Sequence, residues 1–388
     1  MGSRRYARCV ASAGTLDTSF SGDGKKTINF GGVDAARAVL VQSDGRIVVA
    51  GGGTAAGSFC VARLRSNGAL DQTFGSGGKR VIDFGGDQEG AYGAALQADG
   101  KIVLAGDSDL RVAVARLKPN GSLDSTFSGD GRKLFSWGPI GRASAVLVQP
   151  NGKIVLAGFS GPEGGNIQVA RLTAGGALDP TFGTGGKAAI DFGGDDFGLA
   201  VARQADGRIL VAGRSTAAGA VVARLRATGA PDPDFDGDGR VTLPGGGSAS
   251  AVLTQPDGKI VVAGNAGGSA MMTITRLMPN GSLDTTFDAD GTATIDFGSL
   301  ADLANDALLQ PDGKIVVAGY TQADEDVAVA RINGDGSADT TFGVAGRTTI
   351  DFGVATFGNA VARQSDGRLV VVGQRTGADD FAVARLLG

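Results

Sequence analysis

Apolar residues in this chain gather into short runs separated by turns rich in Asp and Gly, and the same order of runs returns along the whole sequence. One copy contains four strand candidates, at Arg80–Phe84, Tyr92–Gln97, Lys101–Ala105 and Arg111–Leu117. The middle two are joined by an Ala-Asp-Gly turn, which is typical of a tight hairpin. The third candidate is almost continuously apolar, and such a strand has both faces covered by other parts of the protein.

The repeat has a period of about 54 residues and can be followed by one phenylalanine in each copy. This residue is Phe20, Phe74, Phe127, Phe182, Phe235, Phe287 or Phe342. A period of this size with several strands per unit is typical of a solenoid or a propeller. Four-stranded sheets repeated around an axis form propeller blades, so the seven copies predict an all-β, seven-bladed β-propeller with four antiparallel strands per blade. A linear β-solenoid is the alternative, but it favours shorter coils and capping repeats, and neither is seen in the sequence.

The order of the strands also predicts how the ring closes. By analogy with propellers whose innermost strand precedes an Asp-Gly turn, the Ala-rich strand ending at Gln97 lines the axis and the Asp-Phe-Gly strand is outermost. The chain opens with such an outer strand at Lys25–Phe30 and ends with three inner ones within Asn359–Leu386. We therefore expect the N-terminal outer strand to join the three C-terminal strands in one blade.

This reading makes residues 15–388 a single propeller preceded by a tail of residues 1–14. The tail contains three arginines but lacks the apolar core of an intact signal peptide. It is interpreted as a decayed strand, a disordered segment or the remnant of a leader, and these alternatives stay open.

Composition excludes several classes of function. The chain has 36 basic and 40 acidic residues and no basic stripe, so we expect no nucleic-acid partner. It has no apolar run long enough to span a membrane. It has no histidine, which excludes Ser-His-Asp and Cys-His catalysis and His-ligated metals. Two cysteines, Cys9 and Cys60, do not make a disulfide framework. We expect a monomer.

Four motifs recur in order in every unit: Leu-Asp-x-x-Phe-Gly, Asp-Phe-Gly-Gly, Gln-x-Asp-Gly-Lys-Ile-Val-Val-Ala-Gly and Ala-Arg-Leu, with variations. Together they resemble the delta-60 repeat family of bacteria over roughly Thr15 to Leu387, and more weakly the NHL-type propellers. The resemblance implies a propeller-like scaffold and a secreted or cell-surface location, and it supplies no catalytic residue. Two units depart from the pattern, at Leu134–Trp137 and at Val241–Pro244, where the proline predicts a frayed outer edge.

One arginine and one aspartate recur in every blade, and the aspartate follows the arginine by eight residues. The arginines are Arg63, Arg116, Arg171, Arg224, Arg276, Arg331 and Arg385, and the aspartates are Asp71, Asp124, Asp179, Asp232, Asp284 and Asp339, with Asp17 in the same register. A residue needed once per blade is structural by default. We expect each arginine to bind its aspartate or backbone carbonyls and so fix a turn; the alternative is a seven-fold ring of identical ligand sites.

Loop lengths indicate where a partner binds. The spacing from the repeated Gln to the next strand's Gly is nine residues in all copies, and the spacing from the repeated Arg to the next Phe is eleven. The other two spacings vary, so both variable loops are expected on one face. The candidate partner-binding residues there are Tyr92, Phe197, Tyr320 and Phe357, which can stack on a sugar or a peptide, and Asp324, Glu325, Asp326, Asp379 and Asp380, which favour a cationic or metal-bridged partner. Plain solvated loops are the alternative.

A candidate calcium loop lies on the opposite face. Asp232, Asp234, Asp236 and Asp238 alternate as in the head of calcium-binding loops, although no glutamate follows at the distal position. Calcium is therefore a candidate ligand, and no other cofactor is indicated. The alternative is that these residues form ordinary Asx-turns.

The sequence thus predicts a non-catalytic binding or structural scaffold that presents variable loops to a protein or glycan partner. The alternative is a propeller enzyme of lyase or lactonase type that uses carboxylates of the axial pocket without histidine. That alternative requires non-repeated carboxylates, lysines or tyrosines at one mouth of the channel. A passive spacer is the third possibility.

Overall fold

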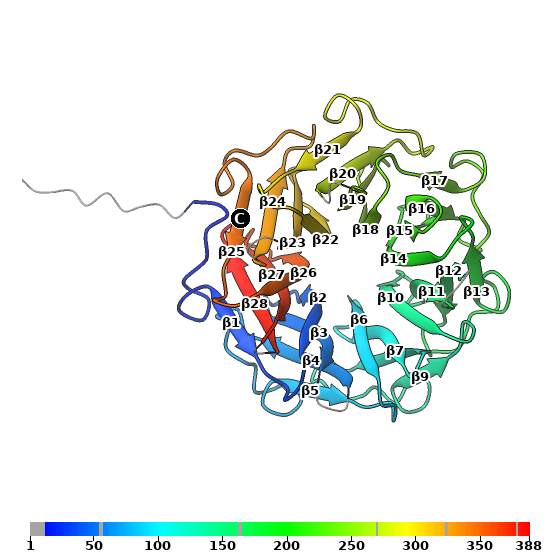
Figure 1. Ribbon diagram of the computed structural model, residues 1–388. Helices are drawn as coiled ribbons and strands as arrows, with labels where there is room; N and C mark the ends of the chain where they lie inside the picture. Colours follow the sequence, from blue (N-terminus) through cyan, green and yellow to red (C-terminus); the bar gives the residue numbers. More distant parts are fainter. Residues whose placement is uncertain (1–11, 54–56, 162–164, 269–270, 323–324, 378) are drawn as a thin grey trace, which may run out of the picture.

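The computed structural model describes residues 12–53, 57–161, 165–268, 271–322, 325–377 and 379–388. They form seven four-stranded antiparallel sheets arranged as blades around an axis (Figure 1). The prediction of an all-β, seven-bladed propeller is therefore confirmed. Among the described residues there is no helix, and so none long and apolar enough to cross a membrane.

The blades are numbered here in chain order, and each is given from its inner to its outer strand. The first is β2 (Ala35–Val41), β3 (Ile47–Gly53), β4 (Ser58–Leu64) and β5 (Lys79–Ile82), and the second is β6 (Glu89–Leu96), β7 (Ile102–Ser108), β8 (Arg111–Leu117) and β9 (Arg132–Phe135). The third is β10 (Gly141–Val148), β11 (Ile154–Ser160), β12 (Ile167–Leu172) and β13 (Lys187–Ile190), and the fourth is β14 (Asp196–Arg203), β15 (Ile209–Ser215), β16 (Gly219–Leu225) and β17 (Arg240–Thr242). The fifth is β18 (Ser248–Thr254), β19 (Ile260–Asn265), β20 (Met272–Leu277) and β21 (Thr292–Ile295), and the sixth is β22 (Asp302–Leu309), β23 (Ile315–Thr321), β24 (Val327–Ile332) and β25 (Arg347–Ile350). The seventh is β26 (Thr356–Arg363), β27 (Leu369–Arg375), β28 (Asp380–Leu386) and β1 (Lys25–Ile28).

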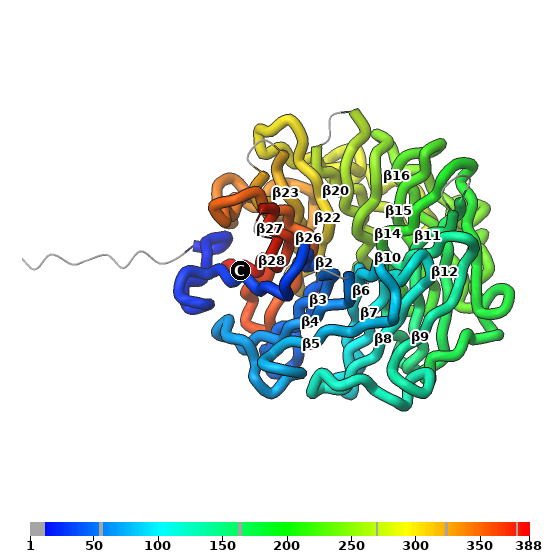
Figure 2. Tube along the Cα trace, turned by 60° about the horizontal axis from the view of Figure 1, so that its bottom comes forward, coloured from blue at the N-terminus to red at the C-terminus, as the bar shows by residue number. Residues whose placement is uncertain are grey.

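Burial follows the hydrophobic pattern of the sequence. The first five residues of the second strand are buried in every blade, because neighbouring sheets cover both faces of this strand. The outer strands are short and only partly buried, and β17, which precedes Pro244, is the shortest. The inner strands surround the axis, and the later strands of each blade lie outside them (Figure 2).

The ring closes as the sequence predicts. The N-terminal strand β1 pairs with β28, with Lys25 opposite Ala384 and Ile28 opposite Phe381. The segment before β1 adds contacts, because the Gly14 N–H donates to the Leu387 carbonyl at 2.8 Å. The first described residues therefore lie beside the C terminus (Figure 1). Residues 1–11, most of the predicted tail, lie outside the described residues.

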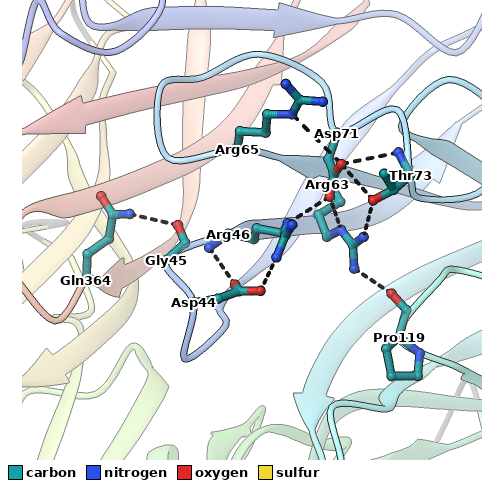
Figure 3. Close-up of polar contacts among 9 residues, drawn as sticks. All are labelled: Asp44, Gly45, Arg46, Arg63, Arg65, Asp71, Thr73, Pro119 and Gln364. Atoms are coloured by element: carbon teal, nitrogen blue, oxygen red, sulfur yellow. Dashed lines mark hydrogen bonds and ion pairs between the residues drawn. The ribbon is translucent and has the colours of Figure 1, made fainter.

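Six of the repeated arginines form an ion pair with the aspartate that follows by eight residues, and Arg385 pairs with Asp17, which stands at the same place in the repeat; the N···O distances are 2.6–2.8 Å. In the first blade, Arg63 also lies over the ring of Phe74. Figure 3 shows Arg63 donating to the carbonyl of Pro119 in the second blade. The same aspartate, Asp71, accepts a second cation, Arg46, from the turn between the first two strands. The aspartate thus joins both turns of constant length on one face, and in six of the blades the arginine also donates to a backbone carbonyl of the next blade.

Candidate binding site at the mouth of the channel

Each inner strand has a β-bulge near the end that faces the variable loops. The register shifts there in all seven blades, and the bulged residues are Arg37, Tyr92, Ser144, Leu199, Ser250, Asn305 and Asn359. All seven line a cavity of about 310 Å³ in the channel. Bulges re-aim side chains and are frequent beside functional sites. The bulged residues differ in size and charge although the strands around them repeat.

A second set of non-repeated residues lies in cross-strand pairs at the same end of the two inner strands. The pairs are Ala35–Gly52, Gly90–Asp107, Arg142–Phe159, Phe197–Arg214, Ser248–Asn265, Leu303–Tyr320 and Phe357–Gln374. In each pair, the second member follows the repeated glycine of the second strand. Positions that serve the fold are the same in every blade, so the positions that differ are the candidates for function. We refer to this end of the channel as the mouth.

Arginines and aromatic rings stack across the first four blades at the mouth. Tyr92 lies between two guanidinium groups, with the Cζ atoms of Arg37 and Arg142 at 4.4 and 4.2 Å from its ring centroid. Arg142 also contacts Phe159, which packs against Phe197. The Cζ atom of Arg214 lies 4.5 Å from the centroid of the Phe197 ring. We call these six residues the Arg–aromatic belt. Guanidinium groups held flat against rings keep their N–H edges available to anions.

The predicted aromatic residues divide into two groups. Tyr92 and Phe197 belong to the Arg–aromatic belt, whereas Tyr320 and Phe357 pack against each other between the sixth and seventh blades, with ring centroids 4.7 Å apart. Burial raises the pKa of Tyr320, so its hydroxyl stays neutral. The structure thus places all four near the mouth, on two sides of it.

Of the predicted acidic residues that the structure describes, Glu325 and Asp326 lie just before β24, and Asp379 and Asp380 lie at the start of β28; none of these four lines the cavity in the channel. Glu325 is exposed, Asp326 is half-buried, and Asp380 pairs with Arg375 at 3.4 Å, next to Asp379. Asp324 lies outside the described residues. The acidic binding face stays a prediction for these loops, whereas the mouth carries Arg37, Arg142 and Arg214, which come from strand positions that the loop lengths do not reveal. Each of these arginines stands at a position of the paired strands where the other six blades have a different residue.

The four aspartates of the candidate calcium loop do not converge. Asp232 is buried and its Oδ2 atom binds Arg224 and Arg208 at 2.6 and 2.8 Å. Asp234 also pairs with Arg208, and Asp238 pairs with Arg240 and accepts its backbone N–H. Asp236 is exposed, with a φ of 52°. In the part of the chain that the structure describes, no group of three or more acidic or cysteine side chains is placed to hold a metal ion. The geometry favours the Asx-turn alternative.

One carboxylate interrupts the small residues of the channel wall. The residue after the bulge is Ala or Gly in six blades and Asp306 in the sixth. Its two oxygens accept the N–H groups of Ala307 and, from the neighbouring blade, Val361, both at 2.9 Å. Burial raises the pKa of Asp306 to about 6, although these hydrogen bonds act in the opposite direction.

Replacing Asp306 by alanine, the residue of most other blades, is expected to stabilise the protein above pH 6. The folded protein holds the Asp306 proton more tightly than the unfolded chain, so the wild type loses stability as the pH rises from about 4 through 6. The gain at pH 8 should be about 1–3 kcal/mol and should vanish near pH 4. Urea unfolding of both proteins at the two pH values measures it. A variant that is equally destabilised at both would show that the carboxylate's two hydrogen bonds outweigh its burial.

The fold and the mouth define a class of protein, the seven-bladed β-propellers with a non-repeated site at one end of the channel. A family model described as a domain of unknown function (DUF5122) β-propeller matches residues 42–74, 97–127, 149–182, 204–235, 255–287, 310–342 and 364–388. The chain belongs to this family, which is of the delta-60 type, as the repeated motifs predict. No curated protein matches the sequence.

Solved structures with the same fold differ strongly in sequence. The chain is similar to virginiamycin B lyase from Staphylococcus aureus, a catalytically inactive form with quinupristin, with a TM-score of 0.60 and 9% identity, over 94% of this chain and 99% of that chain. It is also similar to YCF48 bound to D1 peptide (TM-score 0.55, 10% identity, 97% and 98% covered) and to Kuenenia stuttgartiensis hydrazine synthase (0.57, 11%, 90% and 95%). At these identities the likeness shows the fold alone.

Proposed function

We propose that this protein is a non-catalytic binding module that holds an anionic partner, a glycan or a protein segment, at the mouth of its channel. The Arg–aromatic belt is the observation that carries the proposal. It places three guanidinium groups, from Arg37, Arg142 and Arg214, on one arc of the mouth. Arginine binds carboxylates and sulfates with two parallel hydrogen bonds, and the rings keep the forks in place.

The rest of the propeller serves as a rigid frame for this belt. The seven Arg–Asp ion pairs occupy the opposite face, and they are the same in every blade. The partner is expected outside the cell, in keeping with the secreted or cell-surface location that the repeat family implies. Acidic polysaccharides and acidic protein segments are both found there.

Binding of polymers tests the proposal. Biolayer interferometry on immobilised polygalacturonate, poly-glutamate and neutral dextran should show binding to at least one acidic polymer, weakening with salt, and none to dextran. Arg142→Ala and Arg214→Ala should each weaken binding roughly tenfold. Arg111→Ala is the matched control, because Arg111 is exposed at the start of β8 and is outside the belt. Equal loss in all three variants would reduce the effect to net charge and overturn the proposal.

A second function, an enzyme of lyase or lactonase type, is favoured by one observation. Asp306 is a non-repeated carboxylate in the channel whose pKa is raised to about 6, which suits a general acid or base near neutral pH. Both of its oxygens are already engaged by backbone N–H groups, which supports a role in packing instead. Hydrolysis of a panel of lactones that is lost in Asp306→Ala, with an inflection near pH 6, would establish the enzyme.

A further inference from the structure

A cavity of about 470 Å³ opens above the first blade, beside the Arg–aromatic belt. Its walls are Ala35, Gly52 and Gly53 of the first blade and Tyr92 and Asp107 of the second. At the register of Gly52, the third blade has Phe159 and the sixth has Tyr320. The cavity exists because this blade has small residues where others carry large side chains. Its volume lies in the usual range for small-molecule sites.

Arg37 and Tyr92 approach the cavity closely through the neighbouring glycines. A Cβ atom on Gly52 would lie 3.2 Å from Nη1 of Arg37. A Cβ atom on Gly90 would lie 3.1 Å from the same nitrogen and 3.5 Å from the Tyr92 hydroxyl. A guanidinium fork and a phenol thus lie together at one wall. Burial lowers the pKa of Arg37, which means that the cation gains from an anionic partner.

Asp107 supplies the complementary group. It lines the cavity, and its Oδ1 atom is buried without a hydrogen-bond partner among the described residues. Burial raises the pKa of Asp107, whereas Arg142, Arg37 and a hydrogen bond from Tyr92 lower it. A buried acceptor without a partner costs free energy, so this oxygen favours a ligand that donates a hydrogen bond. Two more carboxylates line the cavity: Glu89 accepts the N–H groups of Phe84 and Gly86, and Asp87 is exposed to solvent. Arg37 is therefore the anion site, and the Asp107 Oδ1 atom is the acceptor that a ligand can use.

We propose that this cavity binds a uronic acid unit, with the sugar carboxylate on Arg37 and a ring hydroxyl donating to Asp107. The inference rests on the proposed anionic partner and specifies it as an acidic glycan. An amino acid also combines a carboxylate with a donor. Its ammonium group, however, would have to leave water and lie close to Arg37 and Arg142, which already face Asp107, so the neutral hydroxyl of a sugar is favoured. The exposed Gln88 and the half-buried Gln374 on the rim suit further hydroxyls.

Calorimetry with three small ligands tests the assignment. Galacturonate should bind saturably and at least tenfold more tightly than galactose, its neutral counterpart, and more tightly than glutamate. Gly52→Phe should abolish binding by filling the cavity, as Phe159 does at the same register of the third blade. Arg37→Ala should weaken binding at least tenfold. This second variant tests the inference even if the Gly52→Phe protein does not fold. The control Arg111→Ala should stay within twofold. Equal binding of galactose, tighter binding of glutamate, or unchanged binding by Gly52→Phe would overturn the inference.

The polymer experiment separates this inference from the proposed function. If polygalacturonate binding depends on Arg142 and Arg214 but not on Arg37 or Gly52, the cavity is not the uronate site and the proposed function stands. If no acidic polymer binds, the proposed function fails. Binding of galacturonate alone would then place a small acidic sugar, not a glycan chain, in the cavity and overturn the part of the inference that concerns the partner.

Discussion

Replacing Asp179 by alanine is expected to destabilise the propeller by about 3–5 kcal/mol, because it leaves a buried cation without its anion. Asp179 binds Arg171 at 2.7 Å and Lys153 at 2.8 Å, and accepts the Thr181 hydroxyl. Arg171 is buried, and its guanidinium also donates to the Ala227 carbonyl of the next blade, so it cannot move into water without losing that contact. Chemical unfolding monitored by circular dichroism measures the loss.

Lys153→Ala is the matched control for this prediction. Lys153 contacts the same carboxylate but is about one-third exposed, so its removal should cost roughly 0–1 kcal/mol.

The hydrogen bonds and ion pairs that Asp179 accepts lower its pKa, although burial acts against them. The wild type therefore loses this stabilisation as the pH falls below the usual range of aspartate, and Asp179→Ala should be the less pH-sensitive protein there. Equal losses in the two variants would show that the buried pair is not what holds the turn.

Removal of residues 1–28 is expected to lower the free energy of unfolding by about 5 kcal/mol or more. The truncated protein should no longer unfold in one cooperative transition. These residues include β1, the outer strand of the seventh blade, and the fully buried Phe20 and Ile28. Without them β28 becomes an unpaired edge, and the buried Arg385 loses Asp17. The measurement is thermal unfolding with two probes, together with analytical ultracentrifugation to detect association through the edge.

One variant and one peptide serve as controls for the truncation. Thr27→Ala changes an exposed position of β1 and should leave the stability within about 0.5 kcal/mol. A synthetic peptide of residues 12–30, added to the truncated chain, should restore the cooperative transition. If the truncated protein unfolds at the wild-type midpoint, the ring does not depend on its mixed blade.

Most of the fold could be predicted from the sequence because it is written seven times. The repeated Phe and Gly positions set the period, and the apolar second strands, such as Ile102–Ser108, predict sheets covered on both faces. The prediction that Arg and Asp eight residues apart would pair follows from the same repetition. What repeats is local or links one blade to the next in a constant way, so reading one copy is enough.

The site was predicted only in part. Tyr92, Phe197, Tyr320 and Phe357 were found as aromatic residues beside variable loops. Arg37, Asp107, Arg142 and Arg214 were missed, because they lie inside strands and not in the loops whose lengths vary. Their common feature is a register relative to the bulge and to the opposite strand, and that register is defined only when the strands pair.

The sequence by itself determined the number of blades, the strand order and the closure of the ring, because each depends on a pattern within one period or on where the chain begins that pattern. Only the tertiary structure decided that Arg37 and Arg142 enclose Tyr92, and that Gly52 and Gly90 leave a cavity beside Asp107. These residues come from three blades and meet because the inner strands converge on one axis. The separation of these residues along the chain does not indicate that they are close in space, whereas the geometry of a closed ring brings them together.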